Sequence, residues 1–147
     1  MLRVSKLTDY ATVVMTVLAD AERVHSAQEL AERAHLELPT VSKLLKQLAH
    51  AELVESFRGV NGGYRLARAP ERITIAEIVI AMEGPIGMTE CSAHAGACGH
   101  EPHCGVRVNW QRINHAIAGA LSSVSLADML HPPTKQRATI PLRVAAM

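Results

Sequence analysis

Apolar residues recur at helical spacing in the first fifty residues and predict three consecutive helices. Residues 9–20 are apolar on most faces, and Thr8 precedes them as a candidate cap, so they predict a buried first helix. Ser26 and Glu29 have the spacing of a capping box and predict a second, short helix. Pro39 suits the first position of a third helix. One face of that third helix carries Val41, Leu44, Leu45 and Leu48.

The next pattern predicts a β-hairpin followed by a helix. Residues 53–57 and 64–67 have strand character and flank the segment 58–63, whose Gly and Asn residues are typical of a hairpin tip. Thr74 and Glu77 form a second capping box, and a Gly-Pro pair ends the helix that they begin. These elements predict a mainly α protein with one hairpin.

A further apolar stripe runs from Val106 to Val124 in steps of three and four residues and predicts one long helix. The stripe consists of Val106, Trp110, Ile113, Ile117, Ala120 and Val124. Such a seam suits packing against another helix, from a second copy of the chain or from the chain's own domain. We expect residues 106–130 to form a dimerisation helix and a short last helix capped by Ser125. Residues 131–147 show no clear pattern and are expected to be disordered.

Composition limits the classes of protein that fit these elements. The chain has 147 residues, 3% aromatic residues and a formal net charge of +1, so its core must be aliphatic and its charge gives no global sign of a nucleic-acid partner. No apolar run approaches the length of a membrane span, and the first residues lack the apolar stretch of a signal peptide. We therefore expect a cytoplasmic protein without a membrane partner. No nucleophile–base pair or phosphate-binding loop indicates an enzyme.

Two short helices joined by a tight turn and followed by a hairpin have the order of a winged helix-turn-helix, and we expect residues 1–83 to form this DNA-binding domain. Between Thr40 and Arg68 there are five basic and two acidic residues, a local charge of +3. The start of the third helix would reach bases, and the hairpin tip would reach a flanking groove or phosphates. Few contacts per subunit would bind weakly, so a dimer on pseudo-palindromic double-stranded DNA is expected. The candidate DNA-binding residues are Pro39, Thr40, Ser42, Lys43, Lys46, Arg58, Asn61, Gly62 and Gly63.

The only three cysteines of the chain, Cys91, Cys98 and Cys104, lie in a polar, glycine-rich segment directly before the long helix. Thiolates are soft ligands that favour iron–sulfur clusters, zinc or cuprous ion. Their wide spacing differs from the close cysteine pairs of structural zinc sites and favours a loop around an iron–sulfur cluster. We expect residues 84–105 to be this cluster-binding loop. A zinc-binding interaction module, or an iron–sulfur carrier without a DNA role, stays an alternative.

Four stretches of the sequence resemble the IscR-type winged-helix regulators. They are residues 5–11 (SKLTDYA), 39–45 (PTVSKLL), 58–66 (RGVNGGYRL) and the three-cysteine segment. Residues 83–91, from Glu-Gly-Pro-Ile to Glu-Cys, resemble the branch that regulates the SUF iron–sulfur assembly operon. The resemblance, over about residues 1–130, implies a homodimeric transcription regulator whose [2Fe-2S] or [4Fe-4S] cluster alters DNA affinity. We expect a repressor of iron–sulfur assembly genes, with a nitric-oxide- or redox-responsive regulator of another operon as the alternative.

The resemblance also implies the ligands of the cluster. Carried over residue by residue, the three cysteines are ligands. Some relatives use a histidine three residues after the third cysteine, but that position here is Arg107, which cannot ligate a metal while charged. Nitric-oxide-sensing relatives use an aspartate near the start of the first helix, which corresponds to Asp9 and would reach the partner subunit's cluster. His100 and His103, in the cysteine segment itself, are the other candidates for a fourth ligand.

Overall fold

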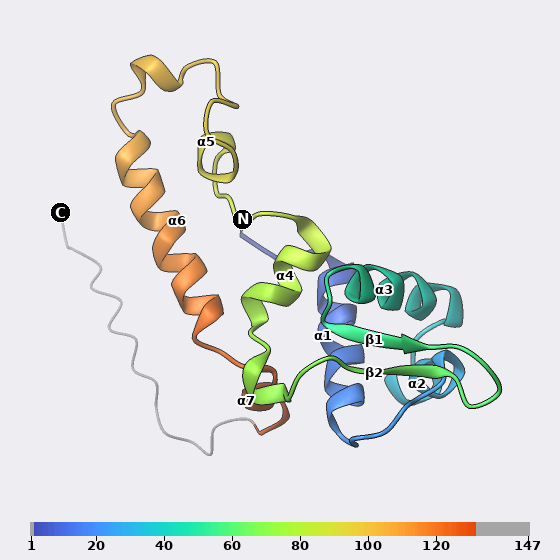
Figure 1. Cartoon of the computed structure of the whole chain (residues 1–147). Coiled ribbons are helices and arrows are strands. Elements are labelled where there is room, and N and C mark those ends of the chain that lie inside the picture. Colours follow the sequence, from blue (N-terminus) through green and yellow to red (C-terminus); the bar gives the residue numbers. More distant parts are fainter. Residues whose placement is uncertain (1, 132–147) are drawn as a thin grey trace.

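The computed structural model describes residues 2–131 and confirms the predicted winged helix-turn-helix architecture with a long C-terminal helix (Figure 1). The elements of the part expected to bind DNA are α1 (Lys6–Ala19), α2 (Ala27–Ala34), α3 (Leu38–His50), β1 (Val54–Phe57), β2 (Gly63–Leu66), the 3₁₀ turn η1 (Pro70–Arg72) and α4 (Ile75–Glu83). The two strands pair antiparallel, from Val54 opposite Leu66 to Phe57 opposite Gly63, and form the wing.

α1 begins three residues earlier than the sequence predicts. The Ser5 hydroxyl accepts a hydrogen bond from the Thr8 backbone N–H at 3.2 Å and caps the helix. The prediction that Thr8 is the cap is therefore wrong, and Thr8 lies buried in the first turn. The cause is a contact distant in sequence. Glu83, at the end of α4, accepts hydrogen bonds from the Ser5 N–H at 2.7 Å and from Thr8 Oγ1 at 2.5 Å, so it fixes both residues.

An aliphatic core joins the helices of this part of the chain. α3 buries its predicted apolar face completely against α1, α2 and β1. Leu126, in the last helix, is also fully buried in this core, and its N–H donates to the Ile73 carbonyl at 2.8 Å. The last helix, expected to belong to the dimerisation segment, packs instead on α1. The buried core is made by Ala11, Val14, Met15, Leu18, Leu30, Ala31, Val41, Leu44, Leu45, Leu48, Leu53, Val54, Ile73, Ile78 and Leu126.

The segment after α4 leaves this core. Its elements are α5 (Glu90–Ala93), the 3₁₀ turn η2 (Glu101–His103), α6 (Arg107–Ser122) and α7 (Leu126–Leu130). Figure 1 shows α5 beside α6, both apart from the wing, before the chain returns through α7 to the core. The segment before the long helix, expected to be a loop, contains two short helical turns. Residues 132–147, for which disorder is expected, lie outside the described residues.

None of the helices in residues 2–131 combines the length and the apolar character needed to cross a membrane.

Truncation of Leu126 tests whether α7 is part of the core of the DNA-binding domain. We expect Leu126→Ala to lower the free energy of unfolding by about 2–5 kcal/mol, because it removes a fully buried side chain and leaves a cavity. The control is Met129→Ala in the same helix, whose exposed side chain predicts a change within about 0.5 kcal/mol. Urea unfolding followed by circular dichroism measures both, and equal effects would show that α7 is not part of this core.

The Glu83 contact predicts a dependence of stability on pH. Hydrogen bonds from Thr8 and then Ser5 lower the pKa of the Glu83 carboxyl below its ordinary 4.5. The unfolded chain therefore binds this proton more readily, and the stabilisation by Glu83 is present above pH 4.5 and is lost as the pH falls through the lowered pKa. We expect Glu83→Gln to cost about 0.5–1 kcal/mol at pH 7 and less at about pH 3.

Urea unfolding at both pH values measures this difference. Glu90→Gln is the control, because the Glu90 carboxylate is exposed and has no hydrogen-bond or ion-pair partner among residues 2–131. A Glu83→Gln loss that stays the same at both pH values would contradict the assignment.

Candidate DNA-binding surface and cysteine loop

α3 presents a polar face opposite its buried face. α2 ends at His35, whose left-handed backbone (φ 53°, ψ 43°) makes the tight turn into α3. This turn leaves one side of α3 accessible, and the α3 side chains predicted to contact DNA lie along it. They are Pro39, Lys43 and Lys46, which are exposed, and Thr40 and Ser42, which are half-buried.

The basic residues of this region divide into paired and unpaired groups. Among residues 2–131, Lys43, Lys46 and Arg58 have no ion-pair or hydrogen-bond partner for their charged groups. The other two of the five basic residues between positions 40 and 68 are paired, Arg65 with Glu55 at 2.8 Å and Arg68 with Glu77 at 2.7 Å. The charges available to DNA phosphates are therefore those on α3 and at the wing tip, which are the predicted contact positions.

The wing tip exposes Arg58, Val60 and Asn61. The two glycines that follow have structural reasons of their own. A Cβ on Gly62 would lie 2.5 Å from the Phe57 carbonyl oxygen, and a Cβ on Gly63 would lie 2.2 Å from the His25 carbonyl oxygen. Both glycines are thus required for close packing of the backbone, whether or not they also approach DNA.

All three cysteines are free thiols and half-buried. Cys91 lies at the start of α5, where its Sγ is 3.3 Å from Thr89 Oγ1, and Cys104 follows η2. Within residues 2–131, no three histidine, cysteine or carboxylate side chains lie close enough together to hold a metal ion. The structure therefore brings the thiols into one segment but does not gather them around one point.

The segment that carries the thiols is joined to α6 by specific polar contacts. Asn114 of α6 accepts from the Met88 N–H at 3.0 Å and donates to the Ile86 carbonyl at 3.1 Å. Glu101 accepts from the Gly96 N–H at 2.8 Å and forms an ion pair with Arg107. The segment is thus a folded loop with two attachments to α6, one near each end.

The donor set fits an iron–sulfur cluster in its chemistry. Three uncommitted thiols in one loop supply the soft ligands that iron favours, and partial burial limits access of water. Arg107 adds positive charge at the start of α6, and its Nε is buried without a hydrogen-bond partner in the described residues. A positive group with a free donor suits a nearby anionic thiolate. The thiols would have to move together to share one centre.

The candidates for a fourth ligand lie in different places. Asp9 is exposed in the first turn of α1, and its carboxylate has no hydrogen-bond or ion-pair partner within residues 2–131. His100 precedes η2 and His103 is its last residue; both are exposed, and their ring centroids are 6.5 Å apart. Because Ser5 caps α1, Asp9 is not needed for that role.

Sequence reasoning missed the residues that hold the loop and the wing in place. Glu83, Asn114 and His25 act through partners distant in sequence, and Glu101 acts through Gly96 and Arg107 within the loop region. The one local signal is Asn114, a polar residue between Ile113 and Ile117 in the apolar stripe. The others carry no pattern that distinguishes them from solvated polar residues.

Comparisons with known proteins agree with this architecture. Residues 4–132 match the Rrf2 family, described as iron-dependent transcriptional regulators. The chain is 37% identical over 101 residues to the HTH-type transcriptional regulator NMA1593 of Neisseria meningitidis serogroup A, a match that covers 69% of this chain and 68% of that protein.

Two solved structures share the fold over most of the chain. CymR (YrzC), the global cysteine regulator of B. subtilis, has a TM-score of 0.70 and 30% identity, and the match covers 91% of this chain and 100% of that one. IscR of T. potens has a TM-score of 0.66 and 31% identity over 88% of this chain and 86% of that one. The predicted IscR-type resemblance is confirmed, and the relatives are transcriptional regulators rather than enzymes. The chain belongs to the Rrf2 family of iron-dependent transcriptional regulators.

Proposed function

We propose that this transcriptional regulator is a homodimeric repressor of iron–sulfur assembly genes, those of the SUF system included, and that a cluster held by Cys91, Cys98 and Cys104 controls its DNA affinity. One observation carries the proposal. Three free, half-buried thiols lie in a loop that follows Glu83 of the DNA-binding part and is attached to α6. A change in this loop can therefore reach both parts. Such a repressor would act in the cytoplasm.

The DNA contacts follow from the unpaired charges. The α3 residues from Pro39 to Lys46 enter the major groove of the operator, Thr40 and Ser42 offer hydroxyls to base edges, and Lys43 binds guanine or phosphate. Arg58 and Asn61 of the wing bind the flanking backbone or groove.

The exposed apolar side of α6 supports a homodimer. Trp110 is 39% exposed and Ile113 is 45% exposed, and no residue of α6 is fully buried by the chain itself. A continuous apolar seam of this length on a soluble protein indicates a partner, and a second α6 has the matching spacing. Two copies of α3 would then face a pseudo-palindromic operator.

The residues of the chain suggest how the loop could act on DNA binding. When bound, an iron–sulfur cluster supplies a centre that is sensitive to iron supply, oxidants and nitric oxide. Drawing the three thiols together requires the loop to rearrange. Glu83 then transmits the change to the start of α1, and Asn114 transmits it to α6, so the spacing of the two recognition helices shifts between two arrangements.

The free carboxylate of Asp9 favours a second candidate trigger. If Asp9 of one subunit completes the cluster of its partner, the exposed oxygen ligand would be labile, which suits a nitric-oxide or redox sensor of another operon. Titration of the DNA complex with nitric oxide, peroxide and chelator distinguishes the triggers. Spectra of Asp9→Ala, His100→Ala and His103→Ala distinguish the three ligand candidates. Membership in a family of transcriptional regulators argues against the alternative without a DNA role.

Replacement of the thiols tests the cluster. We expect Cys91→Ser, Cys98→Ser and Cys104→Ser each to abolish the visible absorption and bound iron of anaerobically purified protein, because a hydroxyl is a poor ligand for iron. Operator affinity should then no longer change when iron is supplied or removed. Absorption spectra, iron and sulfide analysis, and footprints on the DNA selected by the wild-type chain measure these outcomes.

The matched control is His94→Ala, an exposed residue of the same loop, which should keep iron and response. Colourless wild-type protein without iron or sulfide would rule out the cluster but not DNA binding.

A charge in the α6 seam tests the dimer. We expect Ile113→Glu to convert the dimer to a monomer at micromolar concentration and to weaken operator binding by about a hundredfold or more, because the carboxylate would be desolvated in the seam. Sedimentation and fluorescence anisotropy measure both. Gln111→Glu, exposed on the other side of the helix, is the control and should stay dimeric. A dimeric Ile113→Glu variant would place the interface elsewhere.

A further inference from the structure

The wing is anchored to the entrance of α2 by a single residue. The His25 N–H donates to the Tyr64 carbonyl at 2.8 Å, and the Tyr64 N–H donates to the His25 carbonyl at 2.7 Å. β2 is therefore paired on both edges, with β1 on one side and His25 on the other. The absence of a side chain at Gly63 permits this approach, since a Cβ there would meet the His25 carbonyl.

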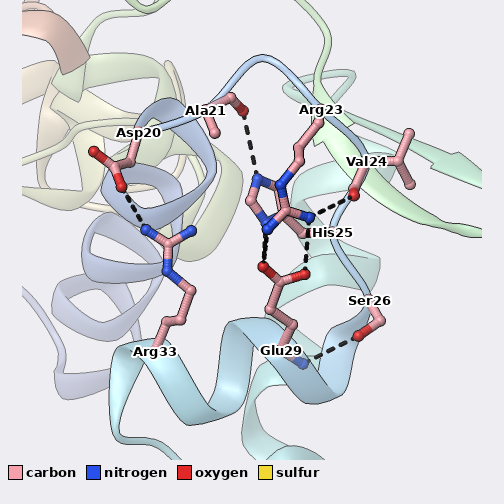
Figure 2. Close-up of polar contacts among 8 residues, drawn as sticks. All are labelled: Asp20, Ala21, Arg23, Val24, His25, Ser26, Glu29 and Arg33. Carbon is pink, nitrogen blue, oxygen red and sulfur yellow. Dashed lines mark hydrogen bonds and ion pairs between the residues drawn. The ribbon is translucent and has the colours of Figure 1, made fainter.

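The imidazole of His25 is fully buried and fixed by polar contacts (Figure 2). Its Nδ1 lies 3.1 Å from Glu29 Oε1, and its Nε2 lies 3.4 Å from the Ala21 carbonyl oxygen. The ring thus links Ala21, near the start of the α1–α2 connection, to the first turn of α2. A buried polar ring with a defined partner restricts its backbone to one position.

Glu29 fixes this ring to the helix-turn-helix. Its N–H donates to the Ser26 hydroxyl at 3.1 Å, which caps α2, and its carboxylate also pairs with Arg23. The hydrogen bond from Arg23, with that of His25 adding to it, lowers the pKa of Glu29 to about 2, so the carboxylate stays ionised at neutral pH. The His25 ring therefore always faces a charged acceptor that belongs to α2.

We infer that His25 is a positioning residue for DNA recognition, which sets the place of the wing relative to α2 and α3 without touching DNA. Its ring is held by α2, its backbone holds β2, and the tip of that hairpin carries Arg58 and Asn61. Because the ring is buried, its effect on DNA must pass through the wing. The inference rests on DNA binding by α3 and the wing, as proposed above.

A double-mutant cycle tests the inference. A DNA duplex is first selected from a random library with the wild-type full-length chain, and affinities are measured by fluorescence anisotropy. His25→Ala should weaken binding about tenfold. The double variant His25→Ala/Arg58→Ala should lose at least about threefold less affinity than the product of the two single losses. The reason is that His25→Ala already impairs the wing contact that Arg58 makes. In combination with Lys43→Ala in α3, the losses should multiply.

Two further variants distinguish positioning from general loss of structure. His25→Asn should recover most of the affinity, because its amide N–H can replace Nδ1 toward Glu29. This variant also keeps the test valid if the alanine variant fails to fold. Arg33→Gln removes the neighbouring Asp20–Arg33 ion pair of Figure 2, which does not involve the wing, and should show no coupling to Arg58→Ala.

Three results have distinct meanings. The inference is supported if the affinity loss of His25→Ala is coupled to that of Arg58→Ala and not to that of Lys43→Ala. Unchanged affinity, or losses that multiply equally with both partners, overturns it. Failure of the wild-type chain to select any duplex would instead overturn DNA recognition itself.

Discussion

The rest of the structure depends on the burial of one face of α3. Leu44, Leu45 and Leu48 are inaccessible to solvent, and their packing against α1 fixes the helix in rotation as well as in position. A helix held in this way can present only its other face, so Thr40, Ser42 and Lys43 face outward as a consequence of core packing. With few aromatic residues in the chain, many small aliphatic contacts supply this constraint, and α7 must return from the far end of α6 to complete it.

Features set by local sequence could be predicted. The capping box at Thr74, the cap at Ser125 and the apolar face of α3 each lie within one helix, and the structure has them as predicted. The N-cap of α1 could not be predicted from the local sequence. Ser5 and Thr8 are both reasonable caps, and the choice between them depends on Glu83, which is 75 residues from Thr8 along the chain.

The candidate site could be predicted in part for the same reason. Cysteine is rare in this chain, so three close together are visible without a structure. The attachments of the loop to Asn114 and Arg107 are not visible, because polar residues on a helix surface usually face solvent. At Gly63 the sequence predicts a functional role where the structure shows a structural one. Its place in the wing suggests contact with DNA, while the structure shows that the backbone of His25 already requires a glycine there.

The positions of these attachments limit how the thiols can influence DNA. In the described residues, the cysteine loop is bonded to α6, and Glu83 just before it is bonded to α1. Within residues 2–131, no hydrogen bond joins the loop to the wing or to residues 20–29. The wing is held instead within the helix-turn-helix by His25 and Glu29. Rearrangement of the loop would therefore move whole DNA-binding units relative to α6 and leave each unit rigid. In the proposed dimer, two rigid units whose spacing changes would bind a palindrome with changed affinity and unchanged half-site preference. Control of occupancy would then be separate from the choice of sequence.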